Sequence, residues 1–308
     1  MSLTEAAKLY PGDPLRSAII ELYAKSSDIL RVLPFQNIMG GALRYNQEQT
    51  LPGIGFRGIN EAFDESTGVI NPVTEPLVIA GGDLDVDNFL IDTMGKSQRA
   101  VHEAMKMKAL ALAWTKTFIK GSQASDPKEF DGLQVRIAGN QLVAAGPTAN
   151  GDALKLSVMD QAIDACDGPT HILMTKAMRR KFSVAARTST VAGDLRWEKD
   201  DFGRQVAYYN DLPIVIVDED NTGTAIIGFN EICPNATGTV TGTSVYILSL
   251  GDGKLSGIQG STPRVSDLGE LQTKSAMRTR IEWYSGIAVF HPKAAVRIYG
   301  ISDAAITA

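Results

Sequence analysis

Apolar residues recur at helical spacing in two segments of the N-terminal part of the chain. The first segment follows Asp13 and Pro14, a capping acid with a proline at the first helical position, and Pro34 ends it. The second segment runs almost uninterrupted from residue 88 to residue 120 and ends before Gly121. At 1.5 Å per residue, a helix over this second segment is roughly 50 Å long. The pattern therefore predicts a strut helix that is longer than most globular domains need.

The stretch between these helices, residues 40–82, has no helical periodicity. Glycine, proline and asparagine interrupt short extended stretches such as ALRYNQ and PLVIAG. A loop of about 40 residues without a helix is uncommon inside a compact domain and usually has a role outside the core. The two extended ends predict a long β-hairpin that projects from the body of the protein.

Shorter elements alternate beyond the strut. The pattern predicts a turn and a short strand in EFDGLQVRI (129–137), a helix over 154–166, a strand over 170–173 and a helix over 176–188 that Thr175 caps. The run LPIVIVDEDNTGTAIIGFN (212–230) indicates two apolar strands joined by a polar turn. The last segment, 277–301, is typical of a β-rich closing element with one break at His291 and Pro292.

Composition adds limits to this picture. With 44% hydrophobic and 21% charged residues over 308 positions, the chain is typical of a globular protein. A net charge of −5 argues against a basic surface that grips nucleic acid. Cys166 and Cys233 form neither a metal-type spacing nor a disulfide framework, and no run approaches the roughly 18 apolar residues that span a bilayer. Because the N-terminus lacks a secretion signal, we expect a cytoplasmic protein without a membrane partner.

Gly53, Gly55 and Gly58 in LPGIGFRGINEAF match the G-x-G-x-x-G spacing of a dinucleotide-binding turn. Such a turn needs a buried parallel strand before it and a full helix after it. The preceding LRYNQEQT is too polar for a strand buried on both faces, and INEAFDES leaves little room for a helix before Gly68. We interpret the match as a glycine-rich loop and expect no cofactor. A dinucleotide-dependent enzyme remains the weakest alternative.

The other chemical motifs are incomplete. Asp218 opens a stretch that imitates a calcium loop, but Phe229 stands where a bidentate glutamate closes the coordination shell. Asp83, Asp85 and Asp87 fail the same test and are interpreted as acids that favour a helix start. The three histidines are scattered, and no serine or cysteine pairs with one of them in a recognisable pattern. The sequence therefore predicts neither a metal site nor catalytic residues.

The order of the elements resembles that of the major capsid proteins of tailed bacteriophages, which have the Hong Kong 97-type fold. LPGIGFRGIN (51–60) looks like the hairpin segment of such proteins, LDVDNFL (84–90) like the start of their spine helix, and FDGLQVRI (130–137) like the segment that enters the peripheral domain. The resemblance covers essentially the whole chain as an order of elements. It implies an α+β fold with an N-terminal arm, an extended β-hairpin loop, a long spine helix, and peripheral and axial domains.

The resemblance also implies a division of the chain and a function. The implied segments are the N-terminal arm (1–39), the extended loop (40–82), the peripheral domain with the spine helix (83–150), the axial domain (151–275) and the closing β segment of the peripheral domain (276–308). The implied protein is a non-enzymatic subunit that assembles with itself, as hexamers and pentamers, into the icosahedral head shell around double-stranded phage DNA. Assembly in the host cytoplasm, with a portal and a cementing or decoration protein, belongs to the same expectation. An encapsulin, a compartment shell of the same fold around an enzyme, is the alternative, although its extended loop is usually shorter.

A projecting hairpin exposes backbone edges and apolar side chains unless it lies across a neighbouring subunit. We therefore expect inter-subunit contacts from the extended loop, through its apolar residues Phe56, Ile59 and Phe63 and its charged residues Arg57, Glu61, Asp64 and Glu65. The candidate partner charges on the spine helix of a neighbour are Lys106, Lys108 and Lys116. Arg57 and Phe63 are the first choices for alanine substitution.

Two departures from the family pattern refine these expectations. Some members join neighbours through an isopeptide bond from a lysine of the extended loop, but no lysine lies between Lys25 and Lys96 here. We therefore expect non-covalent contacts. Some members carry an N-terminal scaffolding domain, for which the segment before residue 40 leaves no room, so we expect a separate scaffold protein.

Charge predicts little contact with the packaged DNA. The negative net charge predicts weak, salt-sensitive DNA affinity for the isolated subunit. MRRKF (178–182) is a small basic cluster within one predicted helix. We interpret it first as a solvated helix face, with contact to the acids of a partner or to nucleic-acid phosphates as alternatives.

Overall fold

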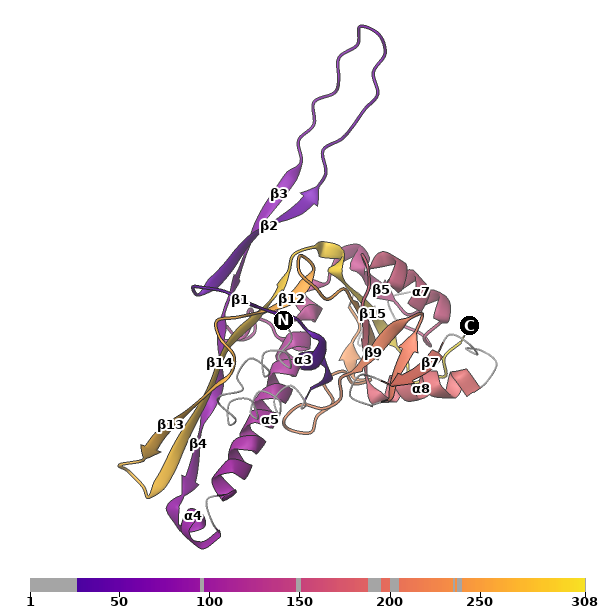
Figure 1. Ribbon diagram of the computed structural model, residues 1–308. Coiled ribbons are helices and arrows are strands. Elements are labelled where there is room, and N and C mark those ends of the chain that lie inside the picture. The colour runs from indigo at the N-terminus through magenta and orange to yellow at the C-terminus, as the bar shows by residue number, and fades with distance from the viewer. Residues whose placement is uncertain are drawn as a thin grey trace.

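The computed structural model of the chain describes residues 27–94, 97–147, 151–187, 195–199, 205–234, 236 and 240–307. Figure 1 shows a narrow arm and a long strut on one side of a broader body. The arm is a hairpin in which β2 (Ala42–Thr50) pairs antiparallel with β3 (Val69–Pro76). Residues 51–68 join no sheet and form the far end of the arm (Figure 1). The predicted projecting hairpin is confirmed.

The arm continues directly into a five-stranded sheet that lies beside the strut. β4 pairs antiparallel with β14 along its whole length, while the opposite edge of β14 pairs with β12 and β13. β1 adds to β12 in parallel. The strands are β1 (Phe35–Asn37), β4 (Val78–Asp87), β12 (Leu255–Gln259), β13 (Arg264–Glu270) and β14 (Ala276–Val289).

Asp83, Asp85 and Asp87 lie in β4, not in the first turn of a helix. This corrects the interpretation of these acids as residues placed by a helix dipole. The physical reason is that the first two acids face arginines of β14, as described below, and this cross-strand pairing favours an extended backbone. Only Asp87 acts at a helix start, where its carboxylate accepts the Phe89 N–H at 2.8 Å.

The strut is α5 (Ser97–Lys120), and the short α4 (Asn88–Met94) precedes it. Residues 95 and 96 lie outside the described residues, and α4 does not continue the axis of α5 in Figure 1. The 24 residues of α5 are therefore roughly 36 Å long at 1.5 Å per residue, shorter than the predicted strut. The predicted end is confirmed, because α5 ends at Lys120, directly before Gly121. A Cβ at residue 121 would stand 2.4 Å from the Phe130 carbonyl oxygen, so this position requires glycine.

A core of aromatic rings joins the strut to the five-stranded sheet. Trp114 and Phe118 of α5 stack with their ring centroids 5.4 Å apart. Trp114 also lies 5.7 Å from Phe35 of β1 and 5.5 Å from Trp283 of β14. All four rings are buried. This packing places the strut flat against the sheet from which the arm extends.

The helix predicted before Pro34 is only partly described. Residues up to 26 lie outside the described residues, so the predicted start at Asp13 and Pro14 belongs to that part. The remainder is α3 (Asp28–Val32), which ends before Pro34 as predicted. Its Ile29 and Leu30 are buried in the core that lies between the strut and the five-stranded sheet, which we call the strut core.

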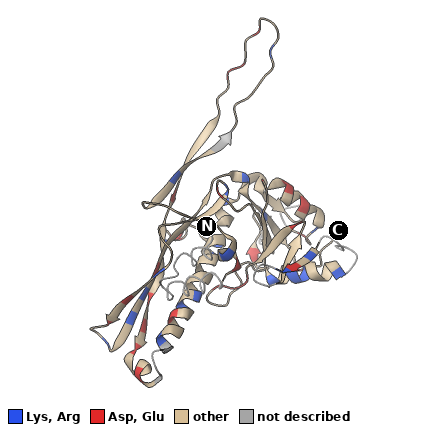
Figure 2. Ribbon diagram, in the orientation of Figure 1, with Lys and Arg blue, Asp and Glu red and all other residues tan. Residues whose placement is uncertain are grey.

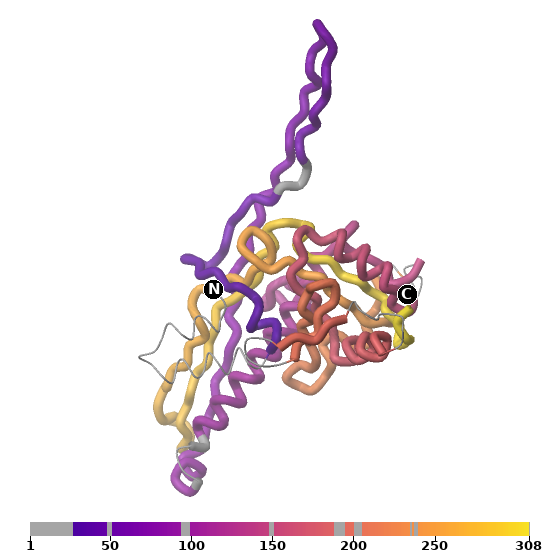
Figure 3. Tube along the Cα trace, turned by 45° about the vertical axis from the view of Figure 1, so that its right-hand side comes forward, coloured from indigo at the N-terminus to yellow at the C-terminus, as the bar shows by residue number. Residues whose placement is uncertain are grey.

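The second body is an eight-stranded mixed sheet with two helices on one face. The strand order is β5-β15-β11-β6-β9-β8-β7, with β10 beside β11. Ile172 of β6 packs with residues of α7 and α8, while the next residue, Leu173, packs on the other face of the sheet, in the strut core. Because successive strand residues point to opposite faces, the sheet separates the two cores. Figures 1 and 3 show both helices on the side away from α5.

The bounds of this second body follow the chain order. The strands are β5 (Leu142–Ala144), β6 (His171–Met174), β7 (Leu195–Lys199), β8 (Gln205–Tyr209), β9 (Leu212–Ile216), β10 (Glu231–Ile232), β11 (Thr241–Leu248) and β15 (Ala295–Ile301). The helices are α7 (Leu156–Ala165) and α8 (Lys176–Arg187), with the 3-10 turns η1 (Gly139–Gln141) and η2 (Pro292–Ala294). The Thr175 hydroxyl accepts the Met178 N–H at 3.2 Å, so the predicted cap of α8 is confirmed.

Two predicted strands are absent, and three strands pair within another sheet than the expected division of the chain implies. Residues 130–137 contain the helix α6 (Leu133–Arg136), which directs Arg136 toward Glu75 of the arm. Residues 225–229 form no strand, because Ile226 and Ile227 follow a turn and both pack into the strut core. β12 and β13, expected in the axial segment, pair with β14, whereas β15, expected in the peripheral segment, pairs with β11.

His171 makes the stability of the second body sensitive to acid. Burial lowers the pKa of its imidazole to about 4. Between about pH 6.5 and pH 4 the unfolded chain therefore binds a proton that the folded chain does not bind. We expect the free energy of unfolding to fall by roughly 2–3 kcal/mol through this window, with no such loss above pH 7. Urea unfolding at pH 7 and pH 4.5 measures the loss, which H171Q reduces; an equal loss in both proteins contradicts this assignment.

Candidate assembly surfaces

The arm ends in a cluster of exposed apolar side chains. Phe56, Ile59 and Ile54 are 104%, 95% and 92% exposed. We call the cluster the tip patch; it consists of Leu51, Ile54, Phe56, Ile59 and Phe63, all exposed. Large apolar side chains gathered in one exposed loop are unfavourable in water and mark sites of protein contact. Three of the predicted contact residues thus stand together at the end of the arm.

Local contacts shape the turn beneath the tip patch. The Arg57 guanidinium lies 5.0 Å from the centroid of the Phe63 ring and donates to the Glu61 carbonyl oxygen at 3.1 Å. The Glu61 carboxylate accepts the Gly58 N–H at 2.7 Å. Arg57 and Glu61, which we expected to pair with a neighbour, therefore already have partners within the tip. Phe56 and Ile59 remain the barest side chains of the patch.

The glycines of the dinucleotide-like spacing belong to this same tip. Gly53, Gly55 and Gly58 follow β2, which is an antiparallel hairpin strand, and the next regular element is β3 rather than a helix. The Ser66 hydroxyl donates to the Gly53 carbonyl oxygen at 2.7 Å and so joins the two sides of the loop. The interpretation of the motif as a loop is confirmed.

A buried ion pair fixes the base of the arm to the body. Glu75 of β3 and Arg136 of α6 form two parallel hydrogen bonds, of which Nη2 to Oε2 is 2.6 Å long. Their side chains are 7% and 16% exposed. Beside them the Tyr45 hydroxyl donates to the Val289 carbonyl oxygen at 2.9 Å, and burial, followed by the charge of Glu75, raises the pKa of Tyr45 to about 12. The arm is thus held in a defined direction.

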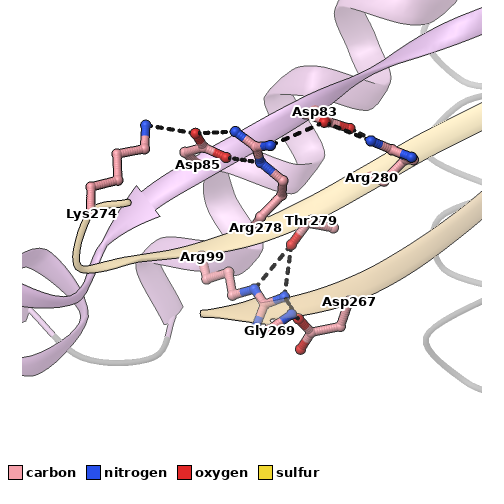
Figure 4. Close-up of polar contacts among 9 residues, drawn as sticks. All are labelled: Asp83, Asp85, Arg99, Asp267, Gly269, Lys274, Arg278, Thr279 and Arg280. Atoms are coloured by element: carbon pink, nitrogen blue, oxygen red, sulfur yellow. Dashed lines mark hydrogen bonds and ion pairs between the residues drawn. The ribbon is translucent and has the colours of Figure 1, made fainter. Parts of the chain in front are cut away.

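Acids of β4 face arginines of β14 across the paired strands (Figure 4). Asp85 accepts two hydrogen bonds from Arg278, at 2.6 and 2.9 Å, and one ion pair from Lys274 at 2.6 Å. Asp83 accepts two from Arg280, at 2.7 and 2.9 Å. The hydrogen bonds from the arginines hold the pKa of both carboxyl groups below the usual range. This charge ladder fixes the register in which β4 carries the arm.

Arg99 connects the strut to the same sheet. Its guanidinium donates to the Thr279 hydroxyl at 2.8 Å and pairs with Asp267 of β13 at 2.8 Å (Figure 4). Glu103, one turn further along α5, accepts from Thr279 at 2.8 Å. The first half of the strut is therefore attached by polar contacts, while its second half is attached by the aromatic core.

A buried polar network joins the end of the strut to the second body. Glu231 of β10 pairs with Lys120 of α5 at 3.1 Å and with Arg297 of β15 at 3.4 Å. It also accepts from Gln134 of α6 at 2.9 Å and from Ser244 of β11 at 2.7 Å. A buried carboxylate with four donors is well satisfied, so the strut, α6 and the eight-stranded sheet are held together at this point.

The three spine-helix lysines occupy different positions. Lys116 pairs with Asp220 of its own chain at 2.9 Å. Lys106 is half-buried and Lys108 is exposed, and neither makes an ion pair with another described residue. Figure 1 shows the tip of the arm far from α5 of the same chain. A contact between a tip acid and one of these lysines would therefore join two copies.

The calcium-like stretch is an internal turn. Asp220 accepts the N–H groups of Thr222 and Thr224 at 2.8 and 3.0 Å and the Thr222 hydroxyl at 2.6 Å. That hydroxyl, together with Lys116, holds the pKa of Asp220 below its usual range. Among the described residues no group of three or more histidine, cysteine or acidic side chains is placed to hold a metal. No described helix is long and apolar enough to span a membrane.

No model of a known protein family and no curated protein sequence matches this chain. Solved structures match it over most of its length. A chain of the SrpI encapsulin complex from Synechococcus elongatus has a TM-score of 0.64 and 15% identity, with 91% of this chain and 89% of that chain covered. The capsid of a native GTA particle has a TM-score of 0.61, 16% identity and coverage of 90% and 91%. A chain from Mycobacterium phage Bobi has a TM-score of 0.60, 13% identity and coverage of 89% and 90%.

The coverage is high on both sides of each comparison, so the similarity concerns the whole arrangement rather than one sheet. Identities of 13% to 16% carry an argument about fold and none about individual residues. The expected order of extended hairpin, spine helix and two further bodies agrees with this similarity. The chain therefore has the α+β Hong Kong 97-type fold of phage major capsid proteins.

Proposed function

We propose that this chain is the major capsid protein of a tailed phage. In this role it is a non-enzymatic subunit that assembles with copies of itself, as hexamers and pentamers, into an icosahedral head shell around double-stranded DNA. The observation that carries the proposal is the arm, which a buried ion pair holds in place and which ends in the bare tip patch. A chain with this fold and such an arm exposes apolar side chains of the kind that contact with another subunit buries.

In the assembled shell, the tip patch lies on a neighbouring subunit. Burying a fully exposed Phe or Ile side chain contributes about 1.5–3 kcal/mol, so Phe56 and Ile59 supply most of the contact. Asp64 and Glu65 are exposed, and among the described residues neither makes an ion pair. They pair with Lys106 and Lys108 of the neighbour in preference to Lys116, because Lys116 is already engaged by Asp220. The lysine-free loop makes this contact without a covalent cross-link.

The expected division of the chain carries over to this proposal with changed bounds. Residues 255–270 belong with the peripheral domain because β12 and β13 pair with β14, and β15 belongs with the axial sheet. Separate scaffold, portal and decoration proteins, and assembly in the host cytoplasm before release in the virion, complete the proposal.

Negative-stain microscopy of the purified protein tests the proposal. We expect closed icosahedral shells, or free hexamers and pentamers, at micromolar protein. A protein that stays a compact monomer or dimer under assembly conditions contradicts the proposal. Addition of NAD or FAD is expected to leave the melting temperature unchanged; a stoichiometric shift revives the enzyme alternative.

The content of the particles separates the phage proposal from the encapsulin alternative, which the similarity to the SrpI encapsulin complex supports. We expect particles from the native source to protect double-stranded DNA from nuclease. A protein cargo without DNA favours the encapsulin. The isolated subunit is expected to bind DNA weakly, with affinity falling as salt rises; a salt-resistant nanomolar complex contradicts this part.

A further inference from the structure

α8 presents a basic face that is only partly paired among the described residues. The 12 residues of the helix include no acidic side chain and five basic ones, Lys176, Arg179, Arg180, Lys181 and Arg187. Lys176 and Lys181 form ion pairs within the chain. Arg180 and Arg187 are exposed and make no ion pair with any described residue. Val184, 55% exposed, lies between them at helical spacing, so the three side chains share one surface.

α7 presents an acidic face in the same layer. Asp160 and Asp164 are one turn apart on its exposed side, and Asp167 follows the end of the helix. The helix itself contains no basic residue. The Asp160 carboxylate accepts the Tyr209 hydroxyl at 3.0 Å, whereas the Asp164 and Asp167 carboxylates have no partner within the described part of the chain.

Among the described residues, no ion pair joins the acidic face of α7 to the basic face of α8 within one chain. Both helices cover the same side of the eight-stranded sheet, but α7 packs on β15 toward one edge and α8 packs beside β7 at the other. Figure 2 shows the acidic α7 and the basic α8 at separate edges of this layer. Two different, complementary patches toward opposite edges of one helix layer permit head-to-tail contact between identical copies, which closes into a ring by rotation.

We propose that the acidic face of α7 in one copy docks against the basic face of α8 in the next copy around a ring. This contact rests on the proposed shell function and names a second surface of it, distinct from the tip patch. A nucleic acid is a less suitable occupant of α8, because the acids of α7 lie in the same layer and repel a backbone that approaches it. A second copy satisfies both faces at once.

Charge reversal on each face tests the docking. The variant R180E/R187E makes α8 repel α7 of the next copy, and D164K/D167K makes α7 repel α8. We expect each variant alone to raise the protein concentration needed for half-maximal assembly about tenfold or more, because exposed attractions become repulsions. The melting temperature of the unassembled subunit is expected to stay unchanged, since these side chains have no ion-pair partner among the described residues of their own chain. The control D92K/K128E reverses two exposed charges elsewhere and is expected to assemble like the wild type.

An equimolar mixture of the two variants gives the decisive readout. In the mixture, the native α7 of the first variant meets the native α8 of the second, and the two reversed faces meet at the next contact. We expect native mass spectrometry to show mixed six-membered rings that alternate the two variants, and the quadruple variant to assemble at the wild-type concentration. Rising salt should weaken assembly of the wild type.

The outcomes separate this docking from the proposed function. A wild type that forms shells while R180E/R187E assembles equally well overturns the docking and leaves the shell function standing. The same result with reduced DNA retention assigns α8 to nucleic acid instead. A loss of assembly that neither mixing nor the quadruple variant restores also overturns the docking. A wild type that never assembles contradicts the proposed function itself.

Discussion

Replacing Glu75 by alanine is expected to lower the free energy of unfolding by about 3–5 kcal/mol. The substitution leaves the guanidinium of Arg136 buried, 16% exposed, without either carboxylate oxygen. Burial lowers the pKa of Arg136, but the hydrogen bonds and charge of Glu75 outweigh that effect and raise it. Because a guanidinium is not deprotonated in proteins, Arg136 keeps its charge when Glu75 is removed. Urea unfolding followed by circular dichroism at pH 7 measures the loss.

Two controls isolate the buried charge. The double variant E75L/R136L removes both partners and is expected to recover much of the stability, since a buried pair replaced by apolar side chains is often neutral. E198A removes an exposed glutamate of β7 and is expected to change stability by no more than about 0.5 kcal/mol. A loss below 1 kcal/mol in E75A, or an equal loss in the double variant, contradicts this account of the arm base.

Long elements with strong periodicity were predictable from the sequence. The strut, the projecting hairpin, α7 and α8 all follow from apolar spacing, caps and breakers that act within a few residues. The acids before the strut show where such reasoning fails. The acids of D-x-D in β4 face the arginines of R-x-R in β14. This shared spacing of two residues indicates paired strands and is present in the sequence. The helical periodicity that follows the acids favoured a helix start instead.

The anchor of the arm gave no local signal. Glu75 and Arg136 are 61 positions apart, and each stands in a segment that reads as a turn or loop, so only the three-dimensional fold brings them together. The same limit applies to Lys116, which looks like a free surface lysine until Asp220, 104 positions away, is placed beside it. Partners chosen by tertiary structure rather than by spacing stay hidden from a single sequence.

The tip patch was predictable in part from the sequence. Three of its five residues, Phe56, Ile59 and Phe63, were predicted as contact residues because a long hairpin has no core of its own. Which of them are bare depended on the backbone, because Arg57 covers the Phe63 ring while Phe56 and Ile59 stay uncovered. The structure therefore favours Phe56 and Ile59 over the pair Arg57 and Phe63 as the first test of the arm.

The variant F56S/I59S is expected to assemble at least 100-fold less readily than the wild type. Each of the two side chains is almost fully exposed in the single chain, and burial against a neighbour contributes about 1.5–3 kcal/mol per side chain. Their loss therefore removes about 3–6 kcal/mol from each arm contact, and a shell repeats that contact at every subunit. Light scattering against protein concentration measures the shift in the assembly threshold.

Folding of the subunit is expected to be unaffected by this substitution, because neither side chain is buried in its own chain. The matched control F89S/I232S replaces the same residue types at positions that are 70% and 68% exposed outside the arm. If removal of exposed apolar surface in general impaired assembly, the control would fail equally. A normal threshold in F56S/I59S, or an equal defect in the control, contradicts the assignment of the tip patch as the contact by which the arm holds the next subunit.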